Sequence, residues 1–201
     1  MQAQIVPNGD FESWESYGSY ENPEFWNTAN DITSSLGVFT TQKTNDSYTG
    51  DFSALMEAKT ALTFTVPGLI TLGEFTIDIW TQESEITGGI PFDLRPDKIN
   101  LFYKYQPVTG DSFRIGMWLL RDDGTDVPDT VATALYNGFD SFEDYNMLSL
   151  KIEYRSEDTP EILNIIAIST NPDNPIVGSV LKIDDIHFEC STNIERRLVS
   201  A

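Results

Sequence analysis

The feature that most constrains the fold is a repeated alternation of short β-forming runs with turn-forming clusters. Runs rich in Val, Ile, Thr, Phe, Tyr and Trp lie between groups of Gly, Pro, Asn and Asp along nearly the whole chain. Helix signals are almost absent, and this spacing is typical of antiparallel sandwiches. We therefore predict an all-β fold, an antiparallel β-sandwich, with strands at residues 36–42, 53–59, 62–66, 74–81, 98–106, 113–121, 131–136, 147–154, 162–170 and 180–188.

Two of these runs show the pattern most clearly. In the run 74–81, one face carries Phe75, Ile77 and Ile79, and the other carries Thr76, Asp78 and Trp80. This alternation predicts a half-buried strand. The run 162–168 is almost continuously apolar, which predicts a central strand covered on both faces. Short helical turns are predicted only at 29–35 and 140–145.

The composition limits both the number of domains and the class of partner. A chain of 201 residues suits one large β domain, which we predict over 1–190, followed by a tail at 191–201 where the pattern is lost. The net charge of −20 argues against nucleic acid and anionic membrane surfaces, because phosphate groups would be repelled. It favours neutral ligands, cations or solubility alone. No apolar run is long enough to insert into a membrane as a helix.

Two features bear on the cellular compartment. Cys190 is the single cysteine, so no disulfide forms within the chain. It has the same strand parity as Ile186 and Phe188, which predicts a core position rather than a nucleophile. Residues 1–4, Met-Gln-Ala-Gln, look like an initiator methionine placed before a mature N-terminus. We therefore expect an exported protein, secreted or displayed on the cell surface, whose signal peptide is absent from this sequence.

Three separate motifs resemble parts of a known sandwich. They are N-G-D-F-E at 8–12, G-x-x-S-A-L at 50–55 and I-D-D-I at 183–186. In this order they resemble the jelly-roll fold of many carbohydrate-binding modules, which is galactose-binding-like. The resemblance implies that the first loop, the G-x-x-S loop and the last strand meet at one edge, where a structural calcium ion is often bound.

Asp184 is the central residue of the predicted calcium site. Its parity matches that of Ile186, so its carboxylate is expected to point toward the core, where an isolated charge is costly without a partner or a metal. Calcium takes about 6–8 oxygen ligands, many of them loop carbonyls. We predict Glu12 and Asp184 as the main side-chain ligands, with Asp10 and Asp51 as weaker candidates. The alternative is that Glu12 and Asp184 accept hydrogen bonds from loop amides without any metal.

The segment 88–111, GGIPFDLRPDKINLFYKYQPVTGD, is dense in proline, glycine and aromatic residues. Because proline is excluded from central strands, we predict a strand bounded by fixed turns. Together with G-S-V-L-K-I-D-D-I at 178–186, the segment resembles the "putative carbohydrate metabolism domain" of Bacteroidetes, which carries G-x-P-F-x-x-R-P followed by Y-Y-K-Y-x-P and G-D. The resemblance covers about residues 8–188 and departs at Phe102, where the family has tyrosine. It supports the fold more strongly than any activity.

The tail carries a further resemblance. Residues 193–201, NIERRLVSA, resemble the run-in to a C-terminal sorting domain of the Bacteroidetes type IX secretion pathway. This resemblance implies export to the cell surface and fusion to another domain in a longer protein. The alternative is an ordinary frayed chain end.

Sugar-binding sites pair a flat aromatic ring with a few polar groups that fix orientation. The aromatic candidates are Trp80, Tyr103, Tyr105 and Trp118, and the polar candidates are Arg95 and Lys104. Two structural alternatives stay open. Tyr103 and Tyr105 have the parity of core residues, and Arg95 is able to pair with Asp93 or Asp111 to fix the proline-flanked loops.

A non-catalytic module that binds glycan is the function these observations favour. The alternatives are a surface adhesion or spacer module and a glycan-processing enzyme. His187 is the single histidine, and the sequence indicates no Ser-His-Asp or Cys-His set around it. Its solvent-facing parity predicts an ordinary surface histidine. Paired carboxylates hydrolyse glycosides, but among 32 Asp and Glu residues a suitable spacing always occurs and carries no information.

Overall fold

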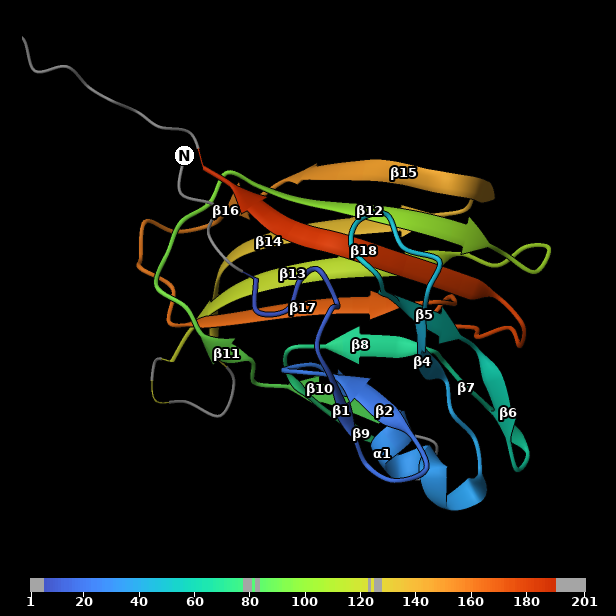
Figure 1. Ribbon diagram of the computed structural model, residues 1–201. Helices are drawn as coiled ribbons and strands as arrows, with labels where there is room; N and C mark the ends of the chain where they lie inside the picture. Colours follow the sequence, from blue (N-terminus) through green and yellow to red (C-terminus); the bar gives the residue numbers. More distant parts are fainter. Residues whose placement is uncertain (1–5, 78–80, 82–83, 123, 125–127, 191–201) are drawn as a thin grey trace, which may run out of the picture.

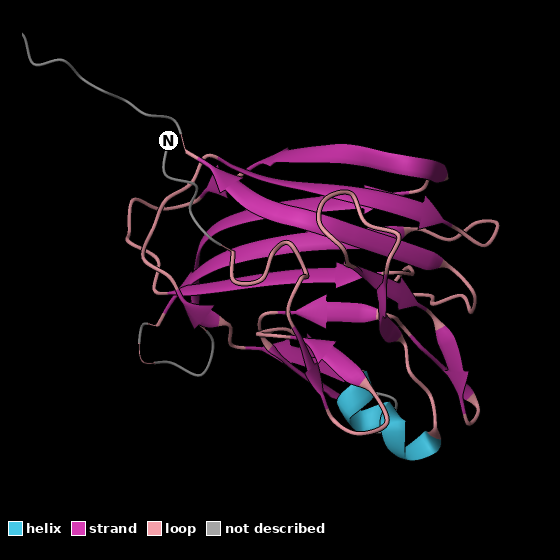
Figure 2. Cartoon of the chain, viewed as in Figure 1, coloured by secondary structure: helices cyan, strands magenta, loops and turns pink. Residues whose placement is uncertain are grey.

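The chain forms a sandwich of two antiparallel sheets in a computed structural model that describes residues 6–77, 81, 84–122, 124 and 128–190. Figure 2 shows that strands dominate and that helix is confined to one short segment. Every strand pairing among the described residues is antiparallel, as the alternating sequence pattern predicts. The predicted all-β sandwich is therefore confirmed.

The smaller of the two main sheets, called here the five-stranded sheet, has the strand order β15-β12-β18-β5-β4. Its strands are β15 (Phe142–Lys151), β12 (Lys98–Gln106), β18 (Val180–Glu189), β5 (Ser53–Glu57) and β4 (Thr41–Thr44). The larger one, the seven-stranded sheet, has the order β16-β14-β13-β17-β8-β3, and β11 pairs with β17 in addition. Its strands are β16 (Glu153–Tyr154), β14 (Asp129–Gly138), β13 (Phe113–Arg121), β17 (Ile162–Ile168), β8 (Leu69–Thr71), β3 (Asn27–Thr28) and β11 (Ile90–Pro91).

The remaining elements gather on one side of the sandwich, below β8 in the view of Figure 1. Three hairpins pair β1 with β2, β6 with β7, and β9 with β10. Their strands are β1 (Trp14–Ser16), β2 (Glu21–Pro23), β6 (Lys59–Ala61), β7 (Phe64–Val66), β9 (Glu74–Ile77) and β10 (Ser84–Thr87). A single helical turn, α1 (Asn30–Thr33), continues into the 3₁₀ turn η1 (Ser34–Leu36). No helix in the described ranges is both long and apolar enough to cross a membrane.

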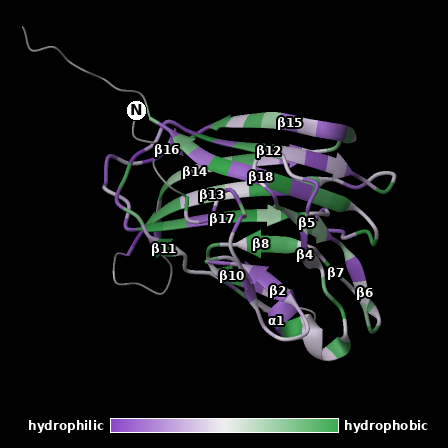
Figure 3. Ribbon diagram, in the orientation of Figure 1, coloured by the Kyte–Doolittle hydropathy of each residue, from purple (hydrophilic) through white to green (hydrophobic). Residues whose placement is uncertain are grey.

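The main core lies between the two sheets. Alternate residues of each strand point inward, which appears in Figure 3 as alternating hydrophobic and hydrophilic bands along β12 and β18. At its centre, the rings of Tyr103 and Tyr105 from β12 pack against Phe113 of β13, with ring centroids 4.9 and 4.7 Å apart. Largely buried core side chains from the strands facing each other are Ile99, Leu101, Ile115, Met117, Leu119, Leu163, Ile165, Leu181 and Ile183.

A second, smaller core covers part of the outer face of the seven-stranded sheet. It packs Val66, Leu69, Phe75 and Ile168 together with partly buried Ile86. These residues come from the β6–β7 and β9–β10 hairpins and from the ends of β8 and β17. The β9–β10 hairpin therefore rests on the sheet through apolar contacts rather than by extending it.

The predicted strands 98–106 and 113–121 match β12 and β13 residue for residue. The run 162–168 is a central strand, as predicted, because β17 lies between β13 and β8. The helical turn predicted at 29–35 is confirmed by α1 and η1. The helical turn predicted at 140–145 is wrong, because Phe142 already begins β15 and pairs with Tyr105 of β12.

The segment 88–97 crosses from the outer face of the seven-stranded sheet to β12. Gly88 and Gly89 have φ values of +67° and +152°, and a side chain at Gly89 would meet the carbonyl of Leu163 at 2.3 Å. This close approach allows Ile90 and Pro91 to pair with β17. The G-G-I-P sequence at 88–91 thus allows the chain to pack closely across the end of the central strand β17.

Arg95 fixes the other end of this segment. Its guanidinium lies 4.1 Å from the ring centroid of Tyr154 and donates to the carbonyl oxygens of Ser156, at 2.9 Å, and Asp158. The predicted ion pair with Asp93 or Asp111 does not occur among the described contacts. The carboxylate of Asp111 instead accepts from the hydroxyl of Thr170 at 2.6 Å and the amide of Asn171 at 2.9 Å.

We predict that Arg95→Lys lowers the free energy of unfolding by about 1–2 kcal/mol, because a lysine cannot both stack on Tyr154 and reach two carbonyls. Arg114→Lys is the matched control, since Arg114 is only partly buried and pairs with Asp173 at 3.4 Å, and a cost below about 0.5 kcal/mol is expected there. Urea unfolding monitored by tryptophan fluorescence measures both. Equal losses in the two variants would contradict a special role for Arg95.

Candidate functional site

A groove lies on the outer face of the seven-stranded sheet, and we call it the Trp118 groove. Its volume is about 470 Å³, which is within the usual range for small-ligand sites. Strands β13, β14 and β17 supply its floor, β10 with Gly88 supplies one wall, and Pro128 belongs to the opposite side. The lining residues are Glu85, Ile86, Thr87, Gly88, Trp118, Leu120, Pro128, Thr130, Asn164 and Ile166.

Trp118 is the aromatic floor of this groove. It points outward because its strand neighbours Met117 and Leu119 are buried in the core. The six-membered ring of the indole reaches back along the strand over Gly116, where an added Cβ would lie only 2.3 Å from the ring carbon Cη2. Glycine at this position therefore lets the indole lie along the sheet, half-buried, instead of standing away from it.

Asn164 stands directly opposite Trp118 on the neighbouring strand β17. Its side chain is only 5% exposed, and its oxygen accepts hydrogen bonds from the hydroxyl of Thr71 at 2.8 Å and the amide of Gly73 at 3.1 Å. These two donors fix which way the side-chain amide faces. Within the described ranges its NH₂ group has no hydrogen-bond partner, although it belongs to a residue that lines the groove. This NH₂ keeps some contact with solvent and is placed to donate to an acceptor in the groove.

The rim adds hydroxyl groups and one negative charge. Thr87 of β10 and Thr130 of β14 both line the groove, and Glu85 is the charged residue among the described lining residues. The wall that carries Glu85 and Thr87 is positioned by Gly88, Gly89 and the pairing of β11 with β17. The segment that resembles a known family therefore helps to build the groove without supplying its floor.

This combination limits the chemistry of the ligand. A flat apolar ring next to a fixed NH₂ donor, hydroxyls and a carboxylate suits a ligand with one apolar face and several hydroxyls. Such a ligand would cover the indole and satisfy the Asn164 donor at the same time.

The structure places the predicted ligand-binding residues in different environments. Trp118 lines the groove, whereas Trp80 lies outside the described residues. Tyr103 and Tyr105 are 2% and 0% exposed, so neither ring is accessible for stacking on a ligand. Both occupy the core positions that their strand parity predicts. Arg95 and Lys104 serve internal contacts. Asn164 and Glu85 were missed, although a single asparagine inside the apolar run 162–168 is an identifiable signal.

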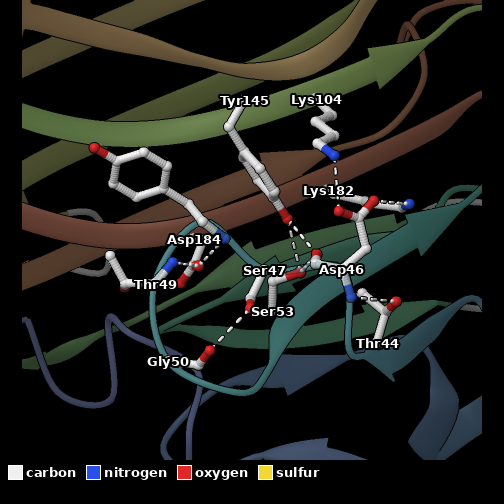
Figure 4. A network of polar contacts seen from close by, with 11 residues as sticks. Thr44, Asp46, Ser47, Thr49, Gly50, Ser53, Lys104, Tyr145, Lys182 and Asp184 are labelled. Carbon is white, nitrogen blue, oxygen red and sulfur yellow. Dashed lines mark hydrogen bonds and ion pairs between the residues drawn. The ribbon is translucent and has the colours of Figure 1, made fainter.

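Lys104 belongs to an ion cluster that fastens the loop 45–52 over the outer face of the five-stranded sheet. Its ammonium lies 2.7 Å from one carboxylate oxygen of Asp46, and that of Lys182 lies 2.6 Å from the other (Figure 4). Burial raises the pKa of Asp46, but the two ammonium groups outweigh burial and hold it below its ordinary value. The hydroxyl of Tyr145 donates to the carbonyl oxygen of Asp46 at 2.6 Å. The carboxylate, the two ammonium groups and the tyrosine hydroxyl of this network all have partners within it, which argues for a structural role.

Asp184 holds the same loop through backbone amides. It is fully buried, and its carboxylate accepts from the amides of Tyr48, Thr49 and Asp185 at 2.7, 2.9 and 2.8 Å. The prediction that it points into the core is wrong. A β-bulge at Asp185, whose φ is +51°, interrupts the alternation of the strand. Ile186 therefore faces the core, whereas Asp184 faces outward beneath the loop. Burial raises the pKa of this carboxyl, against the three amides, which lower it.

Glu12 acts in the same way on the end of the loop. Its Oε1 accepts from the amides of Asp51 and Phe52 at 2.9 and 3.0 Å. Asp10 and Asp51 are exposed. Among the described residues, no group of three or more His, Cys, Asp and Glu side chains is placed to hold a metal ion. The carboxylates of Glu12 and Asp184 thus fit amide clamps better than a calcium site, and the calcium prediction stays untested.

Comparison with family models gives no match, and comparison with curated proteins gives none. Solved structures do match. One from Bacteroides vulgatus, described as a "putative glycoside hydrolase", has a TM-score of 0.72 and 16% identity over 90% of this chain and 97% of that chain. A second with the same description, from Bacteroides thetaiotaomicron, has a TM-score of 0.69 and 16% identity over 91% of this chain and 70% of that chain.

A carbohydrate-binding module specific for non-crystalline cellulose also matches, with a TM-score of 0.50 and 13% identity over 92% of this chain and 94% of that chain. At these identities the likeness shows the fold and leaves the activity open. The fold is a jelly-roll β-sandwich of the type found in carbohydrate-binding modules.

We predict that Asp184→Asn lowers the free energy of unfolding by about 2–3 kcal/mol, because an asparagine turns an NH₂ toward buried amide donors. Asp185→Asn is the control, since that side chain is about one-third exposed and its positive φ suits asparagine, so little change is expected. Chemical denaturation at neutral pH compares them.

The same denaturation curves, measured with added calcium or with a chelator, test the calcium prediction. A calcium-dependent gain in the free energy of unfolding that Asp184→Asn abolishes would support a bound ion.

Proposed function

We propose that this protein is a non-catalytic carbohydrate-binding module and that the Trp118 groove is its glycan site. The observation that carries the proposal is the pairing of a half-buried indole with the unpartnered NH₂ of Asn164 on the adjacent strand. Both groups are held by a rigid sheet, so little conformational entropy is lost when a ligand binds.

A pyranose ring meets the requirements of this groove. One face of such a ring is lined by C–H groups and packs on an aromatic surface, while its edge carries hydroxyl and ring oxygens. An oxygen at that edge can accept from Asn164, and hydroxyls can donate to Glu85. The threonine hydroxyls at the rim act as either donor or acceptor.

Binding is a better proposal than hydrolysis. Glycoside hydrolysis by the common mechanisms uses two carboxylates about 5–10 Å apart, one on each side of the scissile bond. The described lining of the Trp118 groove has one carboxylate, that of Glu85. The jelly-roll sandwich that this chain shares with a cellulose-specific binding module supports the proposal at the level of fold. Export to the cell surface, a structural calcium ion and fusion to other domains remain proposals that rest on the sequence resemblances.

We predict that Trp118→Ala weakens glycan binding at least tenfold, since losing a stacked aromatic removes about 1.5 kcal/mol or more. Affinity electrophoresis in gels that contain single soluble polysaccharides identifies a ligand for the wild-type protein, and titration calorimetry then measures the change. Phe139→Ala is the control, because Phe139 is 65% exposed and is not among the groove-lining residues.

Gly116→Ser is a second test that keeps the tryptophan. The added side chain collides with the indole, so it should displace Trp118 and reduce binding while leaving the thermal unfolding midpoint within a few degrees. If wild-type protein binds a polysaccharide and neither Trp118→Ala nor Gly116→Ser weakens that binding, the groove is not the site.

A further inference from the structure

We infer that the Trp118 groove selects neutral glycans and rejects acidic ones, and that Glu85 is the residue that sets this preference. The inference rests on the proposed function, because it assigns the ligand class of the same groove. It comes from the distribution of charge over the described residues rather than from the shape of the groove.

No cation in the described lining is available to an acidic sugar. The lining residues contain no lysine and no arginine, and their single formal charge is the carboxylate of Glu85. A bound uronate or sulfate would therefore meet a like charge instead of a counterion.

The lysines elsewhere are already neutralised. Each of the six lysines of the chain lies within 2.6–3.3 Å of a carboxylate, so none extends freely over the sheet. Arg121, which ends the groove-forming strand β13, pairs with Asp158 at 2.7 Å. Rearranging one of these pairs to receive an acidic sugar would release a carboxylate and add to the negative field. The net charge of −20 acts in the same direction on the approach of the ligand.

The hydrogen-bonding capacity of the groove also favours hydroxyls. Glu85 accepts hydrogen bonds and donates none when ionised, so it needs a donor, which a sugar hydroxyl offers and a carboxylate lacks. Asn164 presents only its NH₂, because its oxygen is occupied by Thr71 and Gly73. A neutral sugar satisfies both residues with one kind of group.

The repulsion is large enough to measure. Two like charges about 4–6 Å apart repel by roughly 1 kcal/mol in water and by several times more where water is partly excluded, and salt screens exposed pairs. Rejection of acidic glycans should therefore be strongest at low ionic strength, whereas binding of neutral glycans should be almost independent of salt.

The test compares wild-type protein with Glu85→Lys and Glu85→Gln. The probes are neutral soluble polysaccharides, such as β-glucans and galactomannans, and the acidic polymers polygalacturonate and alginate, each at low and high sodium chloride. Glu143→Lys makes the same charge change at an exposed position on β15 of the other sheet and is the matched control.

We expect wild-type protein to bind a neutral polymer at least about tenfold more tightly than either acidic polymer at low salt. Glu85→Lys should gain affinity for the acidic polymers by about tenfold or more, and this gain should shrink in high salt, whereas Glu143→Lys should not gain it. Glu85→Gln conserves the shape of the side chain and removes its charge, so it should reduce the preference for neutral over acidic polymers without reversing it. This variant also provides the test if Glu85→Lys folds poorly.

The two proposals fail in different ways. If wild-type protein binds an acidic polymer as tightly as a neutral one and Trp118→Ala abolishes that binding, the charge inference is overturned and the glycan site stands. If Glu143→Lys gains as much as Glu85→Lys, the preference belongs to the net charge and not to Glu85. If no polymer of either class is bound through Trp118, the proposed function is overturned and the inference falls with it.

Discussion

The contact between the tyrosines of β12 and Phe113 of β13 determines the rest of the sandwich. Tyr103 and Tyr105 lie on one side of Phe113 and join the two sheets at their centre. Once these residues face inward, the alternation of the strand assigns every neighbour to a face. Trp118 and Asn164 face outward as a direct result, so the geometry of the candidate site follows from the packing of the core.

The acidic composition is used inside the fold as well as on its surface. Three carboxylates, those of Glu12, Asp46 and Asp184, hold the loop 45–52 against the five-stranded sheet by accepting from amides or lysines. A carboxylate that accepts several hydrogen bonds can be buried at a tolerable cost. Glu12 and Asp184, the two main predicted calcium ligands, therefore have a structural role as amide acceptors in the described contacts.

The sequence predicts the long strands well and the site poorly, for physical reasons. Strands β12 and β13 match the prediction because nine residues of alternation leave one possible register. Strands such as β3 and β11, with two residues each, have no periodicity to detect and depend on tertiary pairing. Trp118 was a candidate because an aromatic on a predicted strand is visible in sequence. Its partner Asn164 comes from a strand 46 positions later, and only the pairing of β13 with β17 brings the two together.

Gly116 has a consequence for how such sites arise and vary. The depth of the groove is set by a missing side chain two residues before the tryptophan, because that gap lets the ring lie down on the sheet. A substitution at position 116 would thus lift the indole off the sheet without changing Trp118 or Asn164 themselves. In the proposed glycan site, this single small residue therefore controls how flat a surface is offered to the ligand.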